Sequence, residues 1–209
     1  MKILIVDDHA VIHQGLKRIL EDEFQGAEFG EARHAQQALD LAGRERWDVM
    51  ILDIGLPGRG GLEVLKQIHA EHPKLPVIIF SMHSDEHFAV RAFKAGASGY
   101  LEKESAPAQL IEAIRKVIGG GRYVSQNLAE TLAAGLGTDS SRAPHEILSD
   151  REFEVLRMIA AGKTTTAIAE QLSLSAKTVS TYRTRILEKL HLKASSELVR
   201  YAVDHQLDR

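Results

Sequence analysis

The sequence predicts an α/β domain with a doubly wound, five-stranded parallel sheet, followed by an all-α domain of four helices. The first observation is that short apolar runs alternate with amphipathic stretches over residues 1–120, which is typical of a parallel sheet covered by helices. The second is a difference in charge. Residues 1–120 carry 14 Lys and Arg against 18 Asp and Glu, whereas residues 163–193 carry six basic and two acidic residues. An acidic front half therefore precedes a half with one basic segment.

The composition of the 209 residues excludes several classes of protein. With 44% hydrophobic and 26% charged residues, the chain is globular and can bury one large core or two smaller ones, which excludes disordered, collagen and coiled-coil proteins. The absence of Cys excludes disulfide frameworks, thiolate zinc sites and cysteine nucleophiles. The net charge of −3 requires any nucleic-acid surface to be local.

The start of the chain predicts neither a signal peptide nor a membrane anchor. The apolar run Ile3–Val6 meets Asp7 too soon for a signal peptide, and no run in the sequence approaches the length of a membrane span. We therefore expect a cytoplasmic protein with no membrane partner.

Five βα units account for residues 1–120. The predicted strands are Ile3–Val6, Ala27–Phe29, Val49–Leu52, Val77–Phe80 and Gly99–Leu101. After each strand, apolar residues recur every three or four positions, as on the buried face of a helix. These positions are Val11, Leu16, Ile19 and Leu20; Ala38 and Leu41; Leu62, Leu65 and Ile68; Phe88, Ala92 and Phe93; and Leu110, Ile111, Ile114, Val117 and Ile118. Ser84 and Ser105 are predicted helix N-caps, Pro107 belongs in a first turn, and Gly119–Gly121 stops the last helix.

Polar side chains follow the predicted strands at their carboxyl ends. Asp7 and Asp8 follow the first strand, Asp53 the third, Ser81 the fourth and Lys103 the fifth. In a doubly wound sheet these ends gather at one edge, where such folds place their function. Three neighbouring carboxylates repel one another unless a cation joins them, and Mg²⁺ accepts carboxylates, water and a phosphoryl oxygen. The set therefore predicts a magnesium site that carries an acyl phosphate on one Asp.

Each of these residues also has a structural explanation on its own. Asp after a strand is a common turn former, Ser is a common cap, and a single Lys is usually a solvated charge. A purely structural origin requires independent coincidences after four different strands. The combination therefore favours a site.

The second half of the chain predicts a linker and then four helices. Residues 121–145 form the linker, with a short helical pattern through Leu128, Ala129 and Leu132 and a polar stretch over 137–145. Ser149 and Glu152 form a capping box that starts a helix, which ends at Gly162. Further helices are predicted over Thr165–Leu172, from Ser175 to Leu190 and from Ser195 to His205. The tight turn over residues 173–175 indicates a helix-turn-helix.

The third of these helices has a face suited to a DNA major groove. Its predicted buried stripe is Val179, Tyr182, Ile186, Leu187 and Leu190. The opposite side carries Lys177, Ser180, Thr181, Thr184 and Glu188, flanked by Arg183 and Arg185. Composition alone equally allows a solvated helix face, because such mixtures of polar residues are common against water.

The front half resembles the receiver domain of two-component response regulators. The matching segments are Ile5-Val6-Asp7-Asp8-His9, Asp53, Leu56-Pro57-Gly58, Gly61-Leu62-Glu63, Ser81 and Gly96 through Lys103. The resemblance implies that Asp53 accepts phosphate from a sensor histidine kinase. It also implies that Asp7, Asp8, Asp53 and the carbonyl of Gly55 hold Mg²⁺. Ser81, Tyr100 and Lys103 would then form the switch.

Residues 146–209 resemble the LuxR-type helix-turn-helix. The resemblance rests on Leu148 through Glu152, Val155-Leu156, Gly162-Lys163, Ile168-Ala169, Leu174-Ser175, Lys177-Thr178-Val179, Ile186 and Lys189-Leu190. Together with the receiver, the chain resembles a NarL/FixJ-type response regulator, and Val179 through Tyr182 resembles the branch that includes BvgA and EvgA. The resemblance implies a receiver at 1–120, a linker at 121–145 and a DNA-binding domain at 146–209. It also implies a homodimer on phosphorylation, with duplex DNA bound through Lys177, Thr178, Ser180, Thr181, Arg183, Thr184 and Arg185.

The sequence thus predicts a transcription regulator that phosphorylation of Asp53 switches, and not an enzyme. An aspartyl-phosphate phosphatase would share the carboxylate and Mg²⁺ chemistry. Such an enzyme usually has an acid two residues after its nucleophile, where this chain has Gly55. A receiver that acts only through protein partners is the other alternative, and DNA binding by residues 146–209 distinguishes it.

Overall fold

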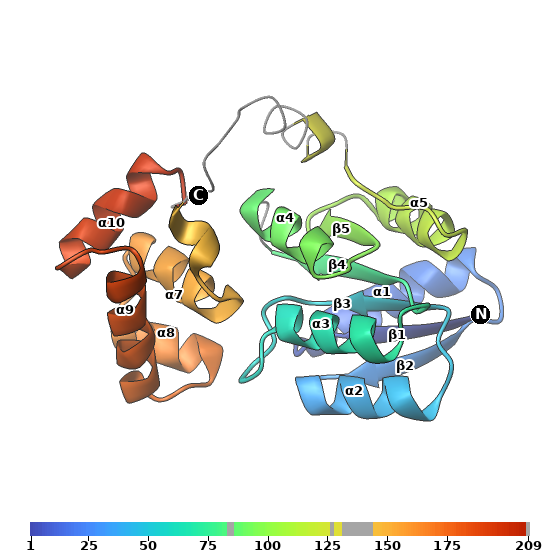
Figure 1. The fold of residues 1–209 in the computed structure, drawn as a ribbon. Coiled ribbons are helices and arrows are strands. Elements are labelled where there is room, and N and C mark those ends of the chain that lie inside the picture. Colours follow the sequence, from blue (N-terminus) through green and yellow to red (C-terminus); the bar gives the residue numbers. More distant parts are fainter. Residues whose placement is uncertain (83–85, 126–127, 131–143, 208–209) are drawn as a thin grey trace. The chain divides into compact units, whose positions relative to one another are not determined.

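The computed structural model describes residues 1–82, 86–125, 128–130 and 144–207. The chain divides into two compact units, Met1–Thr138 and Asp139–Arg209. The first unit contains β1 (Lys2–Val6), α1 (Ala10–Glu23), β2 (Glu28–Ala32), α2 (Ala35–Arg44), β3 (Val49–Leu52), α3 (Gly61–Glu71), β4 (Val77–Ser81), α4 (Glu86–Lys94), β5 (Gly99–Glu102) and α5 (Pro107–Ile118). The second contains η1 (Pro144–Ile147), α7 (Asp150–Ala160), α8 (Thr165–Leu172), α9 (Ala176–Lys189) and α10 (Ser195–Asp204) (Figure 1).

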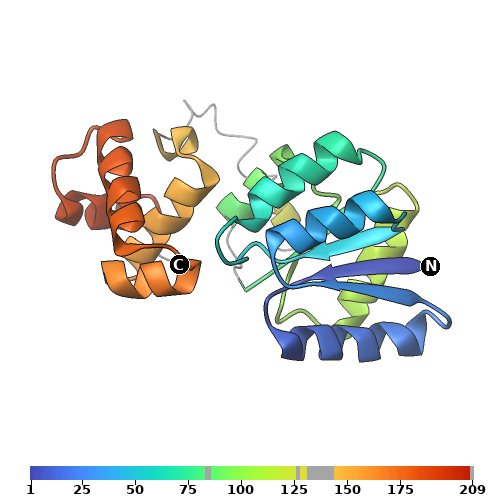
Figure 2. The same cartoon turned by 90° about the horizontal axis from the view of Figure 1, so that it is seen from below.

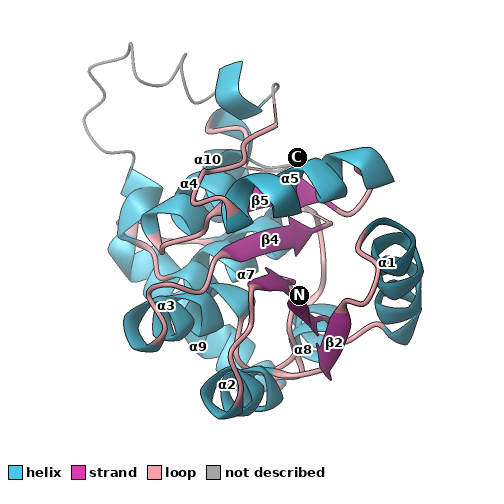
Figure 3. Cartoon of the chain, turned by 90° about the vertical axis from the view of Figure 1, so that its right-hand side faces the viewer, coloured by secondary structure: helices cyan, strands magenta, loops and turns pink. Residues whose placement is uncertain are grey.

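The first unit is the predicted doubly wound fold. Its five strands are all parallel and lie in the order β2-β1-β3-β4-β5. Helix α1 lies on the opposite side of the sheet from α2 and α3 (Figure 2), and α5 shares the side of α1 (Figure 3). The strand order reverses between β1 and β3, and in such folds the ligand site lies beyond the carboxyl ends of the strands at that reversal.

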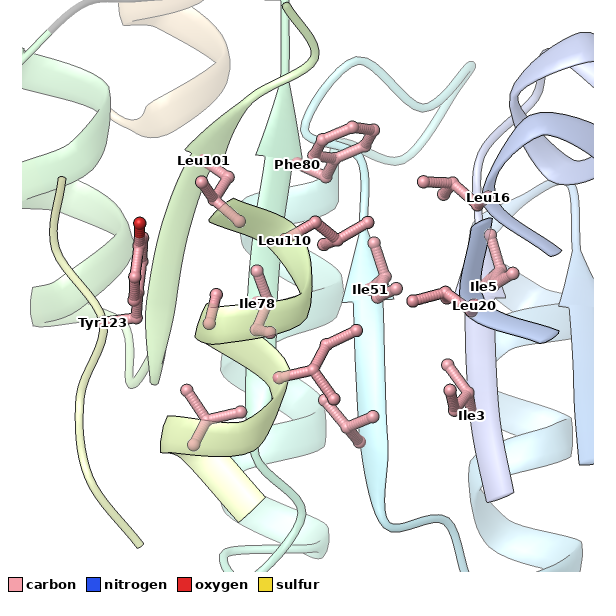
Figure 4. Packing of buried hydrophobic residues seen from close by; sticks show 14 residues of the cluster. Ile3, Ile5, Leu16, Leu20, Ile51, Ile78, Phe80, Leu101, Leu110 and Tyr123 are labelled. Atoms are coloured by element: carbon pink, nitrogen blue, oxygen red, sulfur yellow. The ribbon is translucent and has the colours of Figure 1, made fainter. Parts of the chain in front are cut away.

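One face of the sheet forms an apolar core with α1 and α5. Strand alternation turns Ile3 and Ile5 of β1 to the same side as Ile51 and Ile78. Helix residues close this layer, and Figure 4 shows them meeting the strand side chains. The cluster comprises Ile3, Ile5, Leu16, Leu20, Val49, Ile51, Ile78, Phe80, Leu101, Leu110, Ala113, Ile114, Val117 and Tyr123, all buried. This core holds the sheet rigid beneath the polar residues that follow its strands.

Strand β2 differs from its prediction because it lies at an edge of the sheet. It runs through Ala32, three residues beyond the apolar run that predicted it, and includes Glu28, Gly30 and Glu31. An edge strand is buried less completely than a central one, so it need not be a continuous apolar run. The ring of Trp47 packs on Gly30, where an added Cβ would lie 2.2 Å from the ring.

Tyr123 extends the first unit beyond residue 120. It forms an isolated parallel bridge with Gly99 of β5, in which the Tyr123 amide donates to the carbonyl of Ser98 at 2.9 Å. Its ring is buried in the core and the ammonium group of Lys116 lies 5.9 Å from the ring centre. The domain boundaries remain predictions, but this residue of the expected linker packs as part of the core of the first unit.

The second unit has the predicted helices. Both hydrogen bonds of the Ser149–Glu152 capping box are present at the start of α7. Ser175 caps α9 by accepting a hydrogen bond from the Thr178 amide at 3.0 Å. Between α8 and α9, Ser173 adopts a left-handed conformation with φ of 52° and makes the tight turn of the helix-turn-helix.

The predicted cap of α5 is wrong. Ala106, and not Ser105, is its N-cap residue, and no side chain caps it. Pro107 supplies the first turn, where the missing amide hydrogen costs nothing, so a hydroxyl cap is not required. Gly119 ends the helix as expected. Ser84 and residues 137–143 of the predicted linker lie outside the described residues.

The described helices also bear on the membrane expectation. Each of them is too short or too polar to span a bilayer.

Candidate functional site

The carboxyl ends of β1 and β3 bring two predicted carboxylates together. These strands pair side by side, so Asp7 and Asp53 leave the sheet at neighbouring points. The Asp53 amide donates to the carbonyl of Val6 at 2.9 Å, which carries the ladder one residue past the strand. Both residues are buried, with 2% of Asp7 and 5% of Asp53 exposed.

Lys103 joins the two carboxylates. Its Nζ lies 2.6 Å from Asp7 Oδ2 and 2.9 Å from Asp53 Oδ2, and its side chain is 3% exposed. The Lys103 amide donates to the carbonyl of Ser81 at 2.8 Å, so the ends of β4 and β5 fix its position. The sequence predicted that these residues lie close together, and the sheet brings three strand ends to one point.

Burial governs the charges in this pocket. The pKa of Asp53 is raised because burial disfavours its charged form and Asp7 adds repulsion, and Lys103 offsets only part of this effect. Burial alone would lower the pKa of Lys103, but the attraction of Asp53 and Asp7 outweighs it and raises that pKa. The lysine is therefore held in its charged form.

The pocket carries more negative than positive charge. Ligand atoms of Asp7, Asp8, His9 and Asp53 lie within 4.8 Å of one another. Asp8 is exposed, and His9 Nδ1 lies 2.8 Å from its Oδ1 and 3.0 Å from Asp7 Oδ1. Oxygen donors of this kind, with an excess of carboxylate over lysine, fit a hard divalent cation such as Mg²⁺.

Two glycines allow the chain to pass close to Asp53. The Gly55 amide donates to Asp53 Oδ1 at 3.1 Å. At Gly61, an added Cβ would lie 2.1 Å from the carbonyl oxygen of Asp53. Only glycine fits there, so the start of α3 sets the position of the Asp53 backbone.

The second candidate surface is one side of α9. Val179, Ile186 and Leu190 are buried, while the predicted stripe residues Tyr182 and Leu187 are half-buried. On the other side Lys177, Thr181, Thr184, Arg185 and Glu188 are exposed. Thr178, Ser180 and Arg183 are half-buried. The structure thus places most of the predicted DNA-binding residues on one exposed side of a capped helix.

Comparison with known proteins gives the family. The response regulator receiver domain model matches residues 3–115, and the model of bacterial regulatory proteins of the luxR family matches residues 146–202. The chain is a LuxR-type response regulator. It belongs to the NarL/FixJ family, whose members are DNA-binding transcription regulators and not enzymes. The phosphatase alternative is therefore excluded, and the LuxR-type domain at residues 146–202 contradicts a receiver that acts only through protein partners. The BvgA and EvgA branch stays a prediction.

Individual relatives span nearly the whole response regulator. This chain is 35% identical over 208 residues to response regulator UvrY of Escherichia coli strain K12, and the match covers 99% of this chain and 95% of the relative. It is 39% identical over 213 aligned positions to transcriptional activator protein ExaE of Pseudomonas putida, covering 100% and 99%. A solved structure, RcsB from Salmonella enterica serovar Typhimurium bound to promoter rprA, is 26% identical with a TM-score of 0.64, covering 96% of this chain and 98% of that chain.

Like the Lys103 side chain, the other two predicted switch residues of the response regulator are buried. Ser81 is 1% exposed and Tyr100 is 3% exposed. The switch roles stay a prediction, and any movement of Tyr100 on phosphorylation starts from a buried side chain.

Sequence reasoning missed two residues that fix the sites of the response regulator. His13 of α1 is buried and donates from Nε2 to the carbonyl of Asp7 at 2.6 Å, which ties the first helix to the acid pocket. Lys189 of α9 pairs with Glu152 of α7 at 2.6 Å. Neither contact has a local sequence signal, since each joins residues brought together only by the fold.

Proposed function

We propose that Asp53 is the phosphorylated residue and that its phosphorylation controls DNA binding. The observation that carries the proposal is Lys103 Nζ, placed between Asp7 and Asp53 in a buried pocket. A carboxylate oxygen of Asp53 attacks the phosphorus of the donor, a new O–P bond forms and the bond to the leaving group breaks. Lys103 then balances the charge added to Asp53.

Asp7, Asp8, Asp53 and the Gly55 carbonyl would hold Mg²⁺. When bound, the ion neutralises phosphoryl oxygens during transfer. Asp8 supports this role because it is exposed and its carboxylate lies within 4.8 Å of ligand atoms of Asp7 and Asp53. The chemistry of the family implies a sensor histidine kinase as the natural donor and the cytoplasm as the compartment.

Acetyl phosphate with Mg²⁺ tests the assignment of Asp53. Intact-mass measurement is expected to show one added phosphate on the full chain and none on Asp53→Asn. Asp48→Asn is the matched control, because Asp48 is an exposed carboxylate away from the pocket that accepts from the Lys2 amide. Phosphate on Asp53→Asn contradicts the proposal.

Ser81, Tyr100 and Lys103 would carry the signal from the phosphoryl group to a dimer interface. Ser81 supports this role because its end of β4 is fixed to Lys103 through the backbone. Beryllofluoride, which stands in for the phosphoryl group, is expected to raise the dimer fraction in light scattering. The coupling in such switches is typically about 1–3 kcal/mol. An unchanged mass over a wide concentration range counts against dimerisation.

The DNA contacts would come from the exposed side of α9. Lys177, Ser180, Thr181 and Thr184 lie toward base edges in this proposal, while Thr178, Arg183 and Arg185 flank them toward phosphates. If a dimer neutralises about six phosphates, log affinity falls against log salt with a slope of about −5. A filter-binding salt series measures this slope, and a value near zero means that the side does not hold DNA.

A further inference from the structure

Three hydroxyl groups on α9 donate their protons to their own helix. Ser180 Oγ donates to the carbonyl of Ala176 at 3.0 Å, Thr181 Oγ1 to that of Lys177 at 3.0 Å, and Thr184 Oγ1 to that of Ser180 at 3.1 Å. Each donor bonds the carbonyl four residues earlier, a pattern that serine and threonine adopt inside helices. The three bonds run along one stretch of α9, on the side proposed to face DNA.

These bonds decide what the hydroxyl groups can offer a ligand. A hydroxyl has one proton and two lone pairs, so once it donates to the helix it only accepts. Turning the proton toward a base gives up an existing hydrogen bond. Lys177, Arg183 and Arg185 have the opposite character, because ammonium and guanidinium groups only donate. In the free protein, the hydroxyl groups of this side of α9 are therefore available only as acceptors, and its basic side chains only as donors.

The major groove presents hydrogen-bond donors of one kind. The exocyclic amino groups, N6 of adenine and N4 of cytosine, are its donors, whereas N7 of purines, O6 of guanine and O4 of thymine are acceptors. We propose that Thr181 and Thr184 recognise exocyclic amino groups of bases through lone pairs left by hydrogen bonds to their own helix. The basic side chains then serve the acceptors and the phosphates.

Thr181 and Thr184 are the two hydroxyl residues placed for this contact. Both are exposed and lie three positions apart, so they share one side of the helix. Ser180 makes the same internal bond but is half-buried, and it is left out of the proposal. The inference rests on the proposed DNA-binding side of α9 and specifies what that side reads.

Base analogues combined with matched variants test the proposal on the full chain. A duplex is first selected from a random-sequence library. Adenine is then replaced position by position with purine and cytosine with pyrimidin-2-one, which remove the amino groups, and purines are replaced with 7-deaza analogues, which remove N7. The variants are Thr181→Val and Thr184→Val, which keep the side-chain shape and remove the hydroxyl. Thr181→Ser keeps the hydroxyl, and Thr166→Val, an exposed threonine of α8, is the control.

We expect an amino deletion at one or two positions to weaken binding of the unaltered chain about threefold to tenfold, the effect of one lost hydrogen bond. Thr181→Val or Thr184→Val should show the same loss on the unmodified duplex and no further loss on the matching analogue. Thr181→Ser should behave like the unaltered chain, and Thr166→Val should show no such coupling.

Two results overturn the inference alone, and a third overturns the proposed DNA-binding side of α9 as well. Coupling of the threonines to the 7-deaza positions means that their hydroxyl groups donate. Loss of affinity without coupling to any analogue means that they do not read bases. In the third result, Thr181→Val, Thr184→Val, Lys177→Ala and Arg185→Ala all leave the affinity for the selected duplex unchanged. In that case α9 does not face DNA, and the proposed interface fails together with the inference.

Discussion

The buried ionic groups of the two domains are arranged in opposite ways. In the receiver, Lys103 faces two buried carboxylates and Asp8 lies beside them. In the DNA-binding domain, buried Glu152 pairs with Lys189, and buried Glu154 pairs with Arg151. The Glu152–Lys189 pair joins α7 to α9, and the Arg151–Glu154 pair lies within α7. Charges left in excess cost stability until a ligand balances them, so the excess marks the place of chemistry.

Of the substitutions that test this comparison, replacement of Lys103 should change the free energy of unfolding most. Lys103→Met leaves two buried carboxylates without their cation, and breaking such a pair typically costs about 3–5 kcal/mol. We expect urea unfolding of the receiver at pH 7 without divalent cations to show this loss. Added Mg²⁺ should recover part of it, because the ion takes over the charge.

Lys74→Met provides the control for Lys103. Lys74 is an exposed lysine before β4, and its replacement is expected to change the stability little. A Lys103→Met protein as stable as this control would remove the contrast between the two domains.

Glu152→Gln should cost the DNA-binding domain about 1 kcal/mol, since it weakens both the capping box and the Lys189 pair. Burial alone would raise the pKa of Glu152, but the hydrogen bonds from Lys189 and Ser149 outweigh it and lower that pKa. A lowered pKa contributes stability that is present above the unfolded value of 4.5 and is lost as the pH falls through the folded value.

The pH profile of this variant separates charge from packing. Thermal unfolding of the unaltered chain and Glu152→Gln should differ at pH 7 and converge below pH 4.5. A difference that stays constant across this range would assign the effect to packing alone.

Asp53→Asn should change the stability of the receiver less than Lys103→Met does, and should raise it. Burial and Asp7 raise the pKa of Asp53, so its ionised form destabilises the fold at every pH above that raised value. The neutral amide removes this cost, and Lys103 keeps its pair with Asp7. We expect the thermal midpoint of the receiver to rise by a few degrees at pH 7 without Mg²⁺, and the gain to vanish below pH 3.8, where Asp53 is protonated in both states.

The features that could be predicted from the sequence are local in the chain or follow from the topology of the sheet. Asp7, Asp53 and Lys103 were predictable as neighbours because parallel strands send their carboxyl ends to one edge. The Ser149–Glu152 box was predictable because its four residues are adjacent in the chain.

The features that sequence reasoning missed depend on contacts across the fold. Ser105 reads as a cap, but Pro107 two residues later starts the helix without one. The hydrogen bond from His13 to Asp7 follows from packing between elements. The hydrogen bonds of Thr181 and Thr184 to α9 depend on side-chain rotamers, which no spacing rule supplies.

The bridge between Gly99 and Tyr123 has a consequence for colloidal behaviour. An exposed outer strand offers unpaired amides and carbonyls to other copies of a protein and invites edge-to-edge aggregation. Tyr123 bonds to the outer side of β5, and its carbonyl accepts the Tyr100 amide at 3.3 Å. At the other edge, β2 carries two glutamates and the Trp47 ring over Gly30. At the β5 edge, backbone groups of the sheet thus pair with Tyr123 of the same chain. At the β2 edge, the two glutamates and the Trp47 ring disfavour pairing with another copy. Both features should reduce aggregation when the protein refolds at high concentration.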